Sequence, residues 1–305
     1  MQNQTSITAL MSAFCRAFHA ENNPHPVFAD TAARQLLTPE EYANLSAYVL
    51  GGIDFFTPEK KGAFKSDAEA LLYLIDTQLA PTPLCRAAFA ENALKAAAKT
   101  GTKQYVILGA GLDSFSLRES GFMQTHEVFE VDHPATQADK INRLQRAFSK
   151  NGDTCPRTLR FVPVDFATDD LAEALIKNGF DASKKTLFSW LGVTYYLTKE
   201  AVEKTLNTLS KLCTHGSSLV FDAADENYFS ATEKRVQNTI ALAKAGGEEM
   251  KTAFSYAEIE KLLEKHGFLI YEFLTPNDIQ RQIINARGAN MQAFEHTNFV
   301  LAVKQ

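Results

Sequence analysis

The sequence predicts an α/β fold in which a doubly wound, mostly parallel sheet follows an N-terminal helical segment. From residue 104 onward, short apolar runs of strand length alternate with helical patterns, which indicates βαβ units. The preceding residues carry helix starts and helix ends but no such run. The length of 305 residues allows one large α/β domain or two domains.

The N-terminal segment is predicted to be a series of helices. Thr38 begins a capping box with proline at the first helical position, and Thr57 repeats the cap and the proline. Ser66 opens a further helix, which two prolines end. Another helix is expected over residues 84–98.

Seven apolar runs are predicted to be strands. Helical patterns separate the first five runs, so these strands are expected to be parallel, with right-handed crossovers. The last two runs lack a long helix between them, and we expect them to pair as an antiparallel hairpin. The strands are expected at residues 104–108, 127–131, 159–164, 186–190, 217–221, 268–274 and 298–303.

These patterns predict two parts of the chain. Residues 1–100 are expected to form an N-terminal helical cap, and residues 101–305 the sheet domain. A helical insertion is expected at about 224–254, after the fifth strand. It either covers the site or packs against the rest of the domain, and the sequence leaves both alternatives open.

Composition excludes several classes of protein. Lysine and arginine number 31 against 36 acidic residues, a net charge of −5, which argues against a general nucleic-acid binder. No apolar run is long enough to span a membrane, and the first residues lack the pattern of a signal peptide, so a cytoplasmic protein is expected. No C-x-x-C pair is present, and no metal site is expected. The four cysteines are Cys15, Cys85, Cys155 and Cys213.

The first strand ends in a glycine-containing loop. Gly109 and Gly111, on either side of Ala110, allow a sharp turn and close approach of a ligand to the backbone. Ligands of doubly wound sheets bind at this edge. A dinucleotide fingerprint would place glycine at position 114, where this chain has Ser114, and this lowers the expectation of NAD or FAD.

Acidic residues follow the next two strands. Asp132 lies about twenty residues after the glycines, where a carboxylate accepts hydrogen bonds from a ribose diol. Asp165 and Phe166 end the third strand, and would accept from an adenine amino group and pack on the base. The alternatives are a solvated acid at the end of a strand for Asp132 and the cap of the following helix for Asp165.

Aromatic residues gather after the fourth strand. Trp190, Tyr195 and Tyr196 lie where rings enclose a sulfonium through cation–π contacts. Trp190 is equally consistent with a core residue. In the cap, Arg16 and His19 are three positions apart and share a helix face. These two and the two tyrosines are candidate substrate contacts, although an exposed helix face also explains Arg16 and His19.

Several motifs in this order resemble the leucine carboxyl methyltransferase-like family of S-adenosylmethionine-dependent methyltransferases. The resemblance is to its bacterial branch of natural-product and polyketide O-methyltransferases. It implies a class I, Rossmann-like sheet of seven strands with an antiparallel last strand, behind an N-terminal helical cap. The matching stretches are Ser6–Ala9, Phe28–Asp30, Arg86 with Phe89, Gln104–Asp113 with Arg118, Phe129–Pro134 with Lys140, Phe161–Phe166, Gly179–Asp181 and Trp190–Thr198.

The resemblance implies S-adenosyl-L-methionine as the cofactor and gives its contacts. Arg86 matches the arginine that holds the cofactor's carboxylate, where a guanidinium fork binds bidentately. Gly109 and Gly111 match the glycines beside the methionine moiety, and Asp132 the acid on the ribose hydroxyls. The adenine contacts correspond to Asp165 and Phe166.

Leu191 departs from the family pattern. Many members carry an acid there, which helps to bind the cofactor's ammonium. Without it, backbone carbonyls or water are expected to hold the ammonium.

The sequence favours O-methylation of a small organic acceptor. No side chain stands out as a general base, which suits a carboxylate or an acidic hydroxyl that is already ionised. Three alternatives remain open: a protein C-terminal carboxyl methyltransferase, an inactive cofactor-binding module and a nicotinamide-dependent oxidoreductase. The acceptor, the oligomeric state and any catalytic residue are unknown from the sequence.

Overall fold

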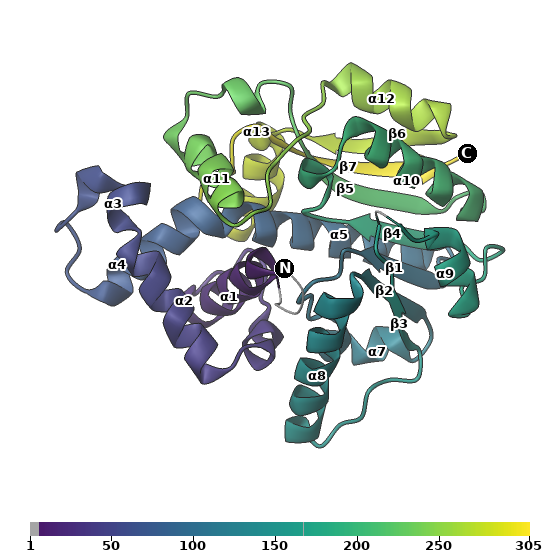
Figure 1. Ribbon diagram of the computed structural model, residues 1–305, viewed down its shortest axis with the longest axis horizontal. Helices are drawn as coiled ribbons and strands as arrows, with labels where there is room; N and C mark the ends of the chain where they lie inside the picture. The colour runs from purple at the N-terminus through teal and green to yellow at the C-terminus, as the bar shows by residue number, and fades with distance from the viewer. Residues whose placement is uncertain (1–5, 167) are drawn as a thin grey trace.

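The computed structural model describes residues 6–166 and 168–305. Figure 1 shows the helices α1 to α4 gathered at one end of the molecule and the sheet at the other, with α5 running between them. The cap helices are α1 (Ile7–Asn22), α2 (Pro39–Gly51), α3 (Ile53–Phe56), α4 (Asp67–Leu74) and α5 (Pro81–Lys99).

The sheet has seven strands in the order β3-β2-β1-β4-β5-β7-β6. Strands β1 to β5 pair in parallel, whereas β7 is antiparallel to both of its neighbours, β5 and β6. The predicted mostly parallel sheet with an antiparallel last strand is confirmed. The strands are β1 (Gln104–Leu108), β2 (Glu127–Asp132), β3 (Leu159–Pro163), β4 (Thr186–Trp190), β5 (Ser218–Ala224), β6 (Phe268–Leu274) and β7 (Thr297–Lys304).

Helices cover both faces of the sheet, and their boundaries follow local signals. Thr38 and Ser255 form capping boxes at the starts of α2 and α12. Gly152 ends α8 in the left-handed conformation. These helices are α6 (Phe115–Arg118), α7 (Ser120–Met123), α8 (Pro134–Asn151), α9 (Leu171–Lys177), α10 (Lys199–Leu212), α11 (Lys234–Ala245), α12 (Tyr256–Lys265) and α13 (Pro276–Ile279).

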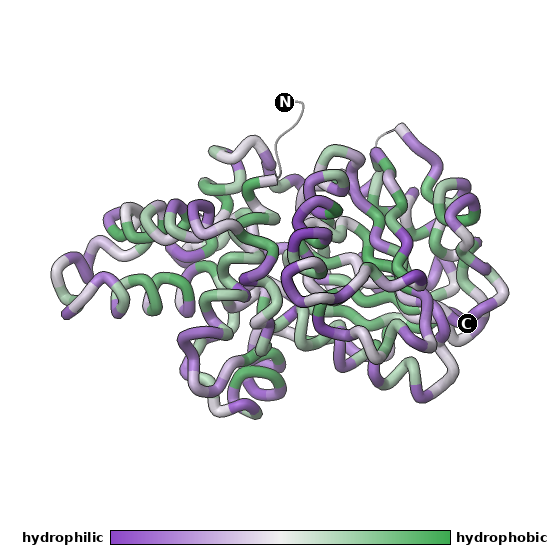
Figure 2. Tube along the Cα trace, turned by 90° about the horizontal axis from the view of Figure 1, so that it is seen from below, coloured by the Kyte–Doolittle hydropathy of each residue, from purple (hydrophilic) through white to green (hydrophobic). Residues whose placement is uncertain are grey.

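The strands separate two apolar cores, because successive side chains point to opposite faces. On one face, Ile107 and Val220 belong to a core that also includes Phe14 and Leu74 of the cap. The cap and the sheet therefore share one buried core. On the other face, Leu108 and the helices α9, α10 and α12 form a second core. Figure 2 shows the apolar segments running through the interior, with polar segments on the outer helices.

Some elements differ from their predicted form. Thr57-Pro58 begins a single 3-10 turn, Pro58–Lys60, rather than a full helix. The helix opened at Ser66 ends as a π-helix over Ile75–Leu79, and Pro81 starts α5 instead of lying in a break. The insertion holds a 3-10 turn, Tyr228–Ser230, and then α11. Within the described residues, no helix is both long and apolar enough to cross a membrane.

Candidate functional site

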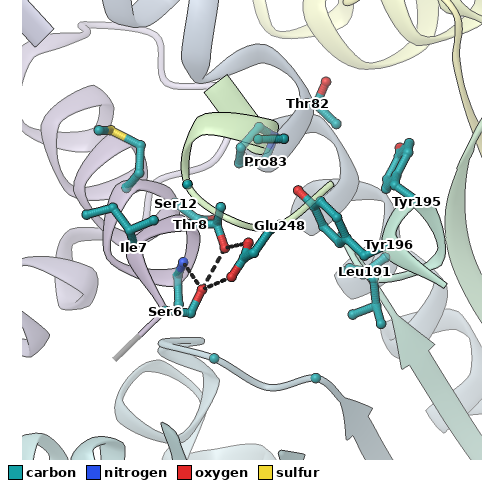
Figure 3. A pocket seen from close by; sticks show the side chains of 18 of the residues that line it. Ser6, Ile7, Thr8, Ser12, Thr82, Pro83, Leu191, Tyr195, Tyr196 and Glu248 are labelled. Carbon is teal, nitrogen blue, oxygen red and sulfur yellow. Dashed lines mark hydrogen bonds between the residues drawn. The ribbon is translucent and has the colours of Figure 1, made fainter. Parts of the chain in front are cut away.

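A cavity of about 830 Å³ lies at the carboxyl ends of β1, β2 and β4. The loops after these strands line one side of it, and residues of the cap and of the insertion line the other. This is the edge at which doubly wound sheets bind ligands. The size is that of a pocket for a cofactor together with a small molecule. Figure 3 shows the cavity with residues from α1, α5, the loop after β4 and the segment after α11 around it.

The glycine loop after β1 brings its backbone against two other segments. Gly109 has φ of +69°, and a Cβ there would lie 2.6 Å from Cγ2 of Val193. Gly111 has φ of +46°, and a Cβ would lie 3.3 Å from the Cβ of Ala9 in α1. Positive φ and close approach both require glycine. Ala110, between them, also lines the cavity.

Asp132 holds this loop from the end of β2. Its carboxylate accepts hydrogen bonds from the backbone N–H groups of Gly111 and, at 2.6 Å, of His133. Burial raises the pKa of Asp132, against the opposing effect of these two hydrogen bonds. A carboxylate has about four acceptor positions, so the group retains capacity for ligand hydroxyls. Asp132 lines the cavity, as a ribose-binding acid requires.

Arg86 reaches the cavity from α5. Its Nη1 donates to Asp222 on β5 at 3.0 Å, and its guanidinium lies against Gly192, whose φ is +72°. Asp222 is fully buried and also accepts from the Gly192 N–H and the Tyr195 hydroxyl, at 2.6 and 3.0 Å. The ion pair with Asp222 fixes the Arg86 guanidinium in place. Its other N–H donors remain on the cavity side, where they can hold a carboxylate ligand.

Of the two residues predicted to contact adenine, only one lies on the cavity. Phe166 lines the cavity beyond the end of β3. Asp165 does not line it, and its backbone N–H donates to the Asp169 carboxylate at 2.8 Å. A role for Asp165 toward adenine stays a prediction.

Trp190 does not lie where a cofactor contact was expected. It is 1% exposed and packs in the core on the other face of the sheet, with Val202 and Leu206 of α10 and with Leu263 of α12. It does not line the cavity. Trp190 is the last residue of β4, and alternation along the strand turns its side chain away from the cap. The structure therefore does not support Trp190 as a cofactor contact.

Arg16 and His19 were expected as candidate substrate contacts, and the structure does not support this. Both are buried side chains of α1 with partners inside the protein. Arg16 reaches the cavity wall, but its guanidinium donates to Asp30 at 2.8 Å and to the Leu112 carbonyl at 2.6 Å. His19 lies off the cavity and contacts Asp76 at 2.9 Å. Arg16 thus fastens the cap to the loop after β1. Neither residue is placed as a substrate ligand.

The two tyrosines after β4 both line the cavity, and a 3-10 turn over Thr194–Tyr196 carries them. The Tyr195 hydroxyl is committed to Asp222. Tyr196 directs its hydroxyl into the cavity in Figure 3. Burial, reinforced by the charge of Glu248, raises the pKa of Tyr196 to about 12. At neutral pH this hydroxyl is therefore a hydrogen-bond donor rather than a base.

Two residues of the site were missed in the sequence. Asp222 directly follows the apolar run predicted as the fifth strand, residues 217–221, and lies within β5 in the structure. An acid next to such a buried run is the signal that it is paired. Glu248 follows Gly246-Gly247 in the insertion and accepts from the hydroxyls of Ser6 and Thr8, at 2.9 and 2.7 Å. No local pattern indicates a contact across more than 200 positions.

These residues fit S-adenosylmethionine. Arg86 offers a guanidinium fork with donors on the cavity side, and the glycine loop is a cradle that any Cβ would fill. Asp132 presents a carboxylate at the end of β2, and Phe166 an aromatic ring beyond β3. The four features occur in one cavity, in the set expected for the cofactor's carboxylate, methionine chain, ribose and adenine.

Comparison with known proteins points to the same cofactor. The family model for leucine carboxyl methyltransferase matches residues 9–210. A protein of Bacillus subtilis strain 168, named "Putative S-adenosyl-L-methionine-dependent methyltransferase YktD", is 42% identical over 100% of this chain and 99% of its own length. A protein of Mycolicibacterium paratuberculosis with the same activity in its name is 31% identical over 77% of this chain and 70% of its own.

Two solved structures share the fold. One, titled a "putative methyltransferase" from Thermobifida fusca, has a TM-score of 0.57 at 13% identity and covers 99% of this chain and 96% of its own. A protein from Streptomyces avermitilis has a TM-score of 0.56 at 16% identity, over 85% of this chain and 95% of its own. The family model and the relatives argue against the nicotinamide-dependent alternative. The chain belongs to the leucine carboxyl methyltransferase family and is an S-adenosylmethionine-dependent methyltransferase.

Proposed function

We propose that this enzyme methylates an oxygen of a small organic acceptor, a carboxylate or an acidic hydroxyl that is ionised before it binds. The observation that carries the proposal is the composition of the cavity. Its cofactor residues lie on the sheet side and on α5. The rest of its cap side is largely apolar, and the one arginine there among the described residues, Arg16, donates to Ser12, Asp30 and the Leu112 carbonyl. A small apolar molecule with one reactive oxygen suits that space.

The cap-side wall supports a small acceptor. It is built from α1, α2, α3, the π-helix and α11, and each contributes large apolar side chains. The π-helix also places Gln78 on the cavity, with only a long 3.4 Å hydrogen bond to the neighbouring Thr77. π-Helical turns are frequent at functional sites, because the extra residue redirects side chains. The apolar members of this wall are Met11, Tyr48, Phe56, Leu79 and Leu242.

The titratable groups support an acceptor that needs no proton removed. Among the described residues that line the cavity, the one histidine is His133, whose Nδ1 accepts from the Ala135 N–H at the start of α8. Tyr196, with its raised pKa, donates a hydrogen bond rather than accepting a proton. A carboxylate acceptor is ionised at pH 7, since its pKa is about 4. The residues then align the acceptor and exclude water.

In this proposal the residues of the site bind the cofactor and position the acceptor. When bound, S-adenosylmethionine supplies an activated methyl group. Arg86 and the loop of Gly109 and Gly111 hold the methionine end, Asp132 holds the ribose, and Tyr196 donates a hydrogen bond toward the acceptor. The cap closes the space above them and keeps bulk water out.

The test uses cofactor carrying a radiolabelled methyl group and a panel of small carboxylates, phenols, alcohols, amines and thiols. We expect label in products from carboxylates or acidic phenols. Mild alkali releases labelled methanol from a methyl ester but not from a methyl ether, so it identifies the oxygen. A flat rate from about pH 6 to 8 is expected for a carboxylate acceptor, because its ionisation is complete in that range.

Other outcomes would overturn this proposal. Transfer to peptides with a free C-terminal carboxylate, in preference to the small acids, would favour the protein C-terminal alternative. Cofactor binding without transfer to any acceptor would favour an inactive binding module. A rate that rises through a pKa near 7 would indicate a general base.

A further inference from the structure

Glu248 is an acid on the cavity wall whose placed partners are neutral. Its Oε1 accepts from the Ser6 hydroxyl at 2.9 Å and its Oε2 from the Thr8 hydroxyl at 2.7 Å. Within residues 6–166 and 168–305, no lysine, arginine or histidine pairs with it. Figure 3 shows the carboxylate between the first residues of α1 and Tyr196. A carboxylate in a cleft without a cation is suited to a cationic ligand.

Glu248 lies at the methionine end of the cofactor site. Thr8, which holds it, precedes Ala9, and the Cβ of Ala9 lies 3.3 Å from the position of a Cβ on Gly111. Leu191, where the family pattern has an acid, lines the same cavity. The carboxylate is therefore held next to the residue of α1 that packs on the glycine loop.

The other acids that line the cavity are bound by backbone N–H groups or lie near a lysine. Asp113 accepts from the Phe115 N–H at 2.7 Å, and Asp132 accepts from two backbone N–H groups. Glu249 points to Lys244, with 3.6 Å between the charged atoms, and is mostly exposed.

Two buried acids, one in the cap and one in β2, lie away from the cavity. Asp30 does not line the cavity and is bound by Arg16 and Ser114. Glu130 is a buried residue of β2, and its carboxylate lies 2.6 Å from the Lys140 ammonium.

We propose that Glu248 accepts a hydrogen bond from the ammonium group of S-adenosylmethionine, and so supplies from the insertion the charge that Leu191 lacks. The ammonium is a charged donor, and the Ser6 and Thr8 hydroxyls fix the carboxylate that receives it. The contact also joins the insertion, the N-terminal part of α1 and the cofactor. It replaces the expectation that backbone carbonyls or water hold the ammonium.

The test is a thermodynamic cycle measured by calorimetry. S-adenosylhomocysteine and its analogue without the amino group are titrated into the full-length protein and into Glu248→Gln. Glu248→Gln is expected to weaken S-adenosylhomocysteine binding by about 10- to 100-fold, the range for a hydrogen bond between charged groups. The variant should change the affinity for the analogue by less than about threefold. Glu249→Gln, a neighbouring acid, serves as the matched control and should leave both affinities unchanged.

Two results would overturn the proposal. Equal losses for both ligands in Glu248→Gln would show that Glu248 only fastens the insertion to α1. In the unaltered protein, a loss of less than about tenfold for the analogue would show that no carboxylate pairs with the ammonium. This second measurement needs no variant, so it can overturn the proposal even where Glu248→Gln does not fold. Thr8→Val, which removes one hydroxyl, should give a smaller loss in the same direction.

Discussion

Replacing Gly192 by alanine is expected to displace the Arg86 guanidinium and weaken cofactor binding. An alanine Cβ would lie 2.6 Å from Nη1 and 2.7 Å from Cζ of Arg86, closer than atoms of these kinds approach. The backbone cannot easily yield, because the Gly192 N–H donates to the buried Asp222 at 2.6 Å. The guanidinium must therefore move from its position between Asp222 and the cavity.

The size of the expected loss in affinity follows from the hydrogen bonds that the displaced Arg86 guanidinium would no longer donate to the ligand. Charge-assisted hydrogen bonds are worth about 1.5–3 kcal/mol, which corresponds to roughly 10- to 150-fold in affinity for S-adenosylhomocysteine. The φ of +72° adds about 1–2 kcal/mol of strain to the folded state, since alanine avoids this conformation. Calorimetry measures the first effect and urea unfolding the second.

Gly179→Ala separates the two effects. Gly179 has φ of +90°, and a Cβ there would meet no atom within 4 Å. It should show a similar loss of stability with unchanged affinity. Affinity unchanged in folded Gly192→Ala, or lowered as much in Gly179→Ala, would refute the assignment of Arg86 to the cofactor's carboxylate.

Three further predictions concern single residues. Asp132→Ala should weaken S-adenosylhomocysteine binding by about 1.5–3 kcal/mol in calorimetry, and an unchanged affinity would remove Asp132 from the site. Trp190→Phe should lower the free energy of unfolding by about 1–3 kcal/mol but leave that affinity unchanged, because the side chain lies in the opposite core. Burial alone would raise the pKa of Asp30, but Arg16 and Arg118 lower it overall. The stability it gives is therefore present above about pH 4 and is lost as the pH falls through its folded-state pKa. Urea unfolding of Asp30→Asn should then show a loss at pH 7 that becomes smaller as the pH falls below about 4.

Local patterns were sufficient for the sheet and for the loops at its edge. Apolar runs between helices predicted every strand to within a few residues, and the missing long helix before β7 predicted the antiparallel pair. The glycine loop and Asp132 could be found because chain topology brings the ends of parallel strands to one edge. Arg86 came only from the family resemblance, since nothing in its helix distinguishes it.

The remaining features depend on tertiary contacts. Arg16 and His19 fit an exposed face by residue type, yet each is buried and meets a carboxylate from another element, Asp30 and Asp76 respectively. By sequence, Trp190 fits a cofactor contact and a core residue equally well. Only its place in β4 shows that the side chain points into the core. Glu248 is joined to Ser6 and Thr8 by contacts that span most of the chain. Such pairings follow from packing and leave no periodic signal.

The most direct test is a crystal structure of the full-length protein with S-adenosylhomocysteine. We predict the ligand's carboxylate on Arg86, its ribose hydroxyls on Asp132 and its ammonium on Glu248, with the adenine against Phe166. The sulfur should then face the cap-side wall that includes Leu79 and Leu242. A ligand bound in the reverse direction, or outside the cavity, would contradict the account of the site.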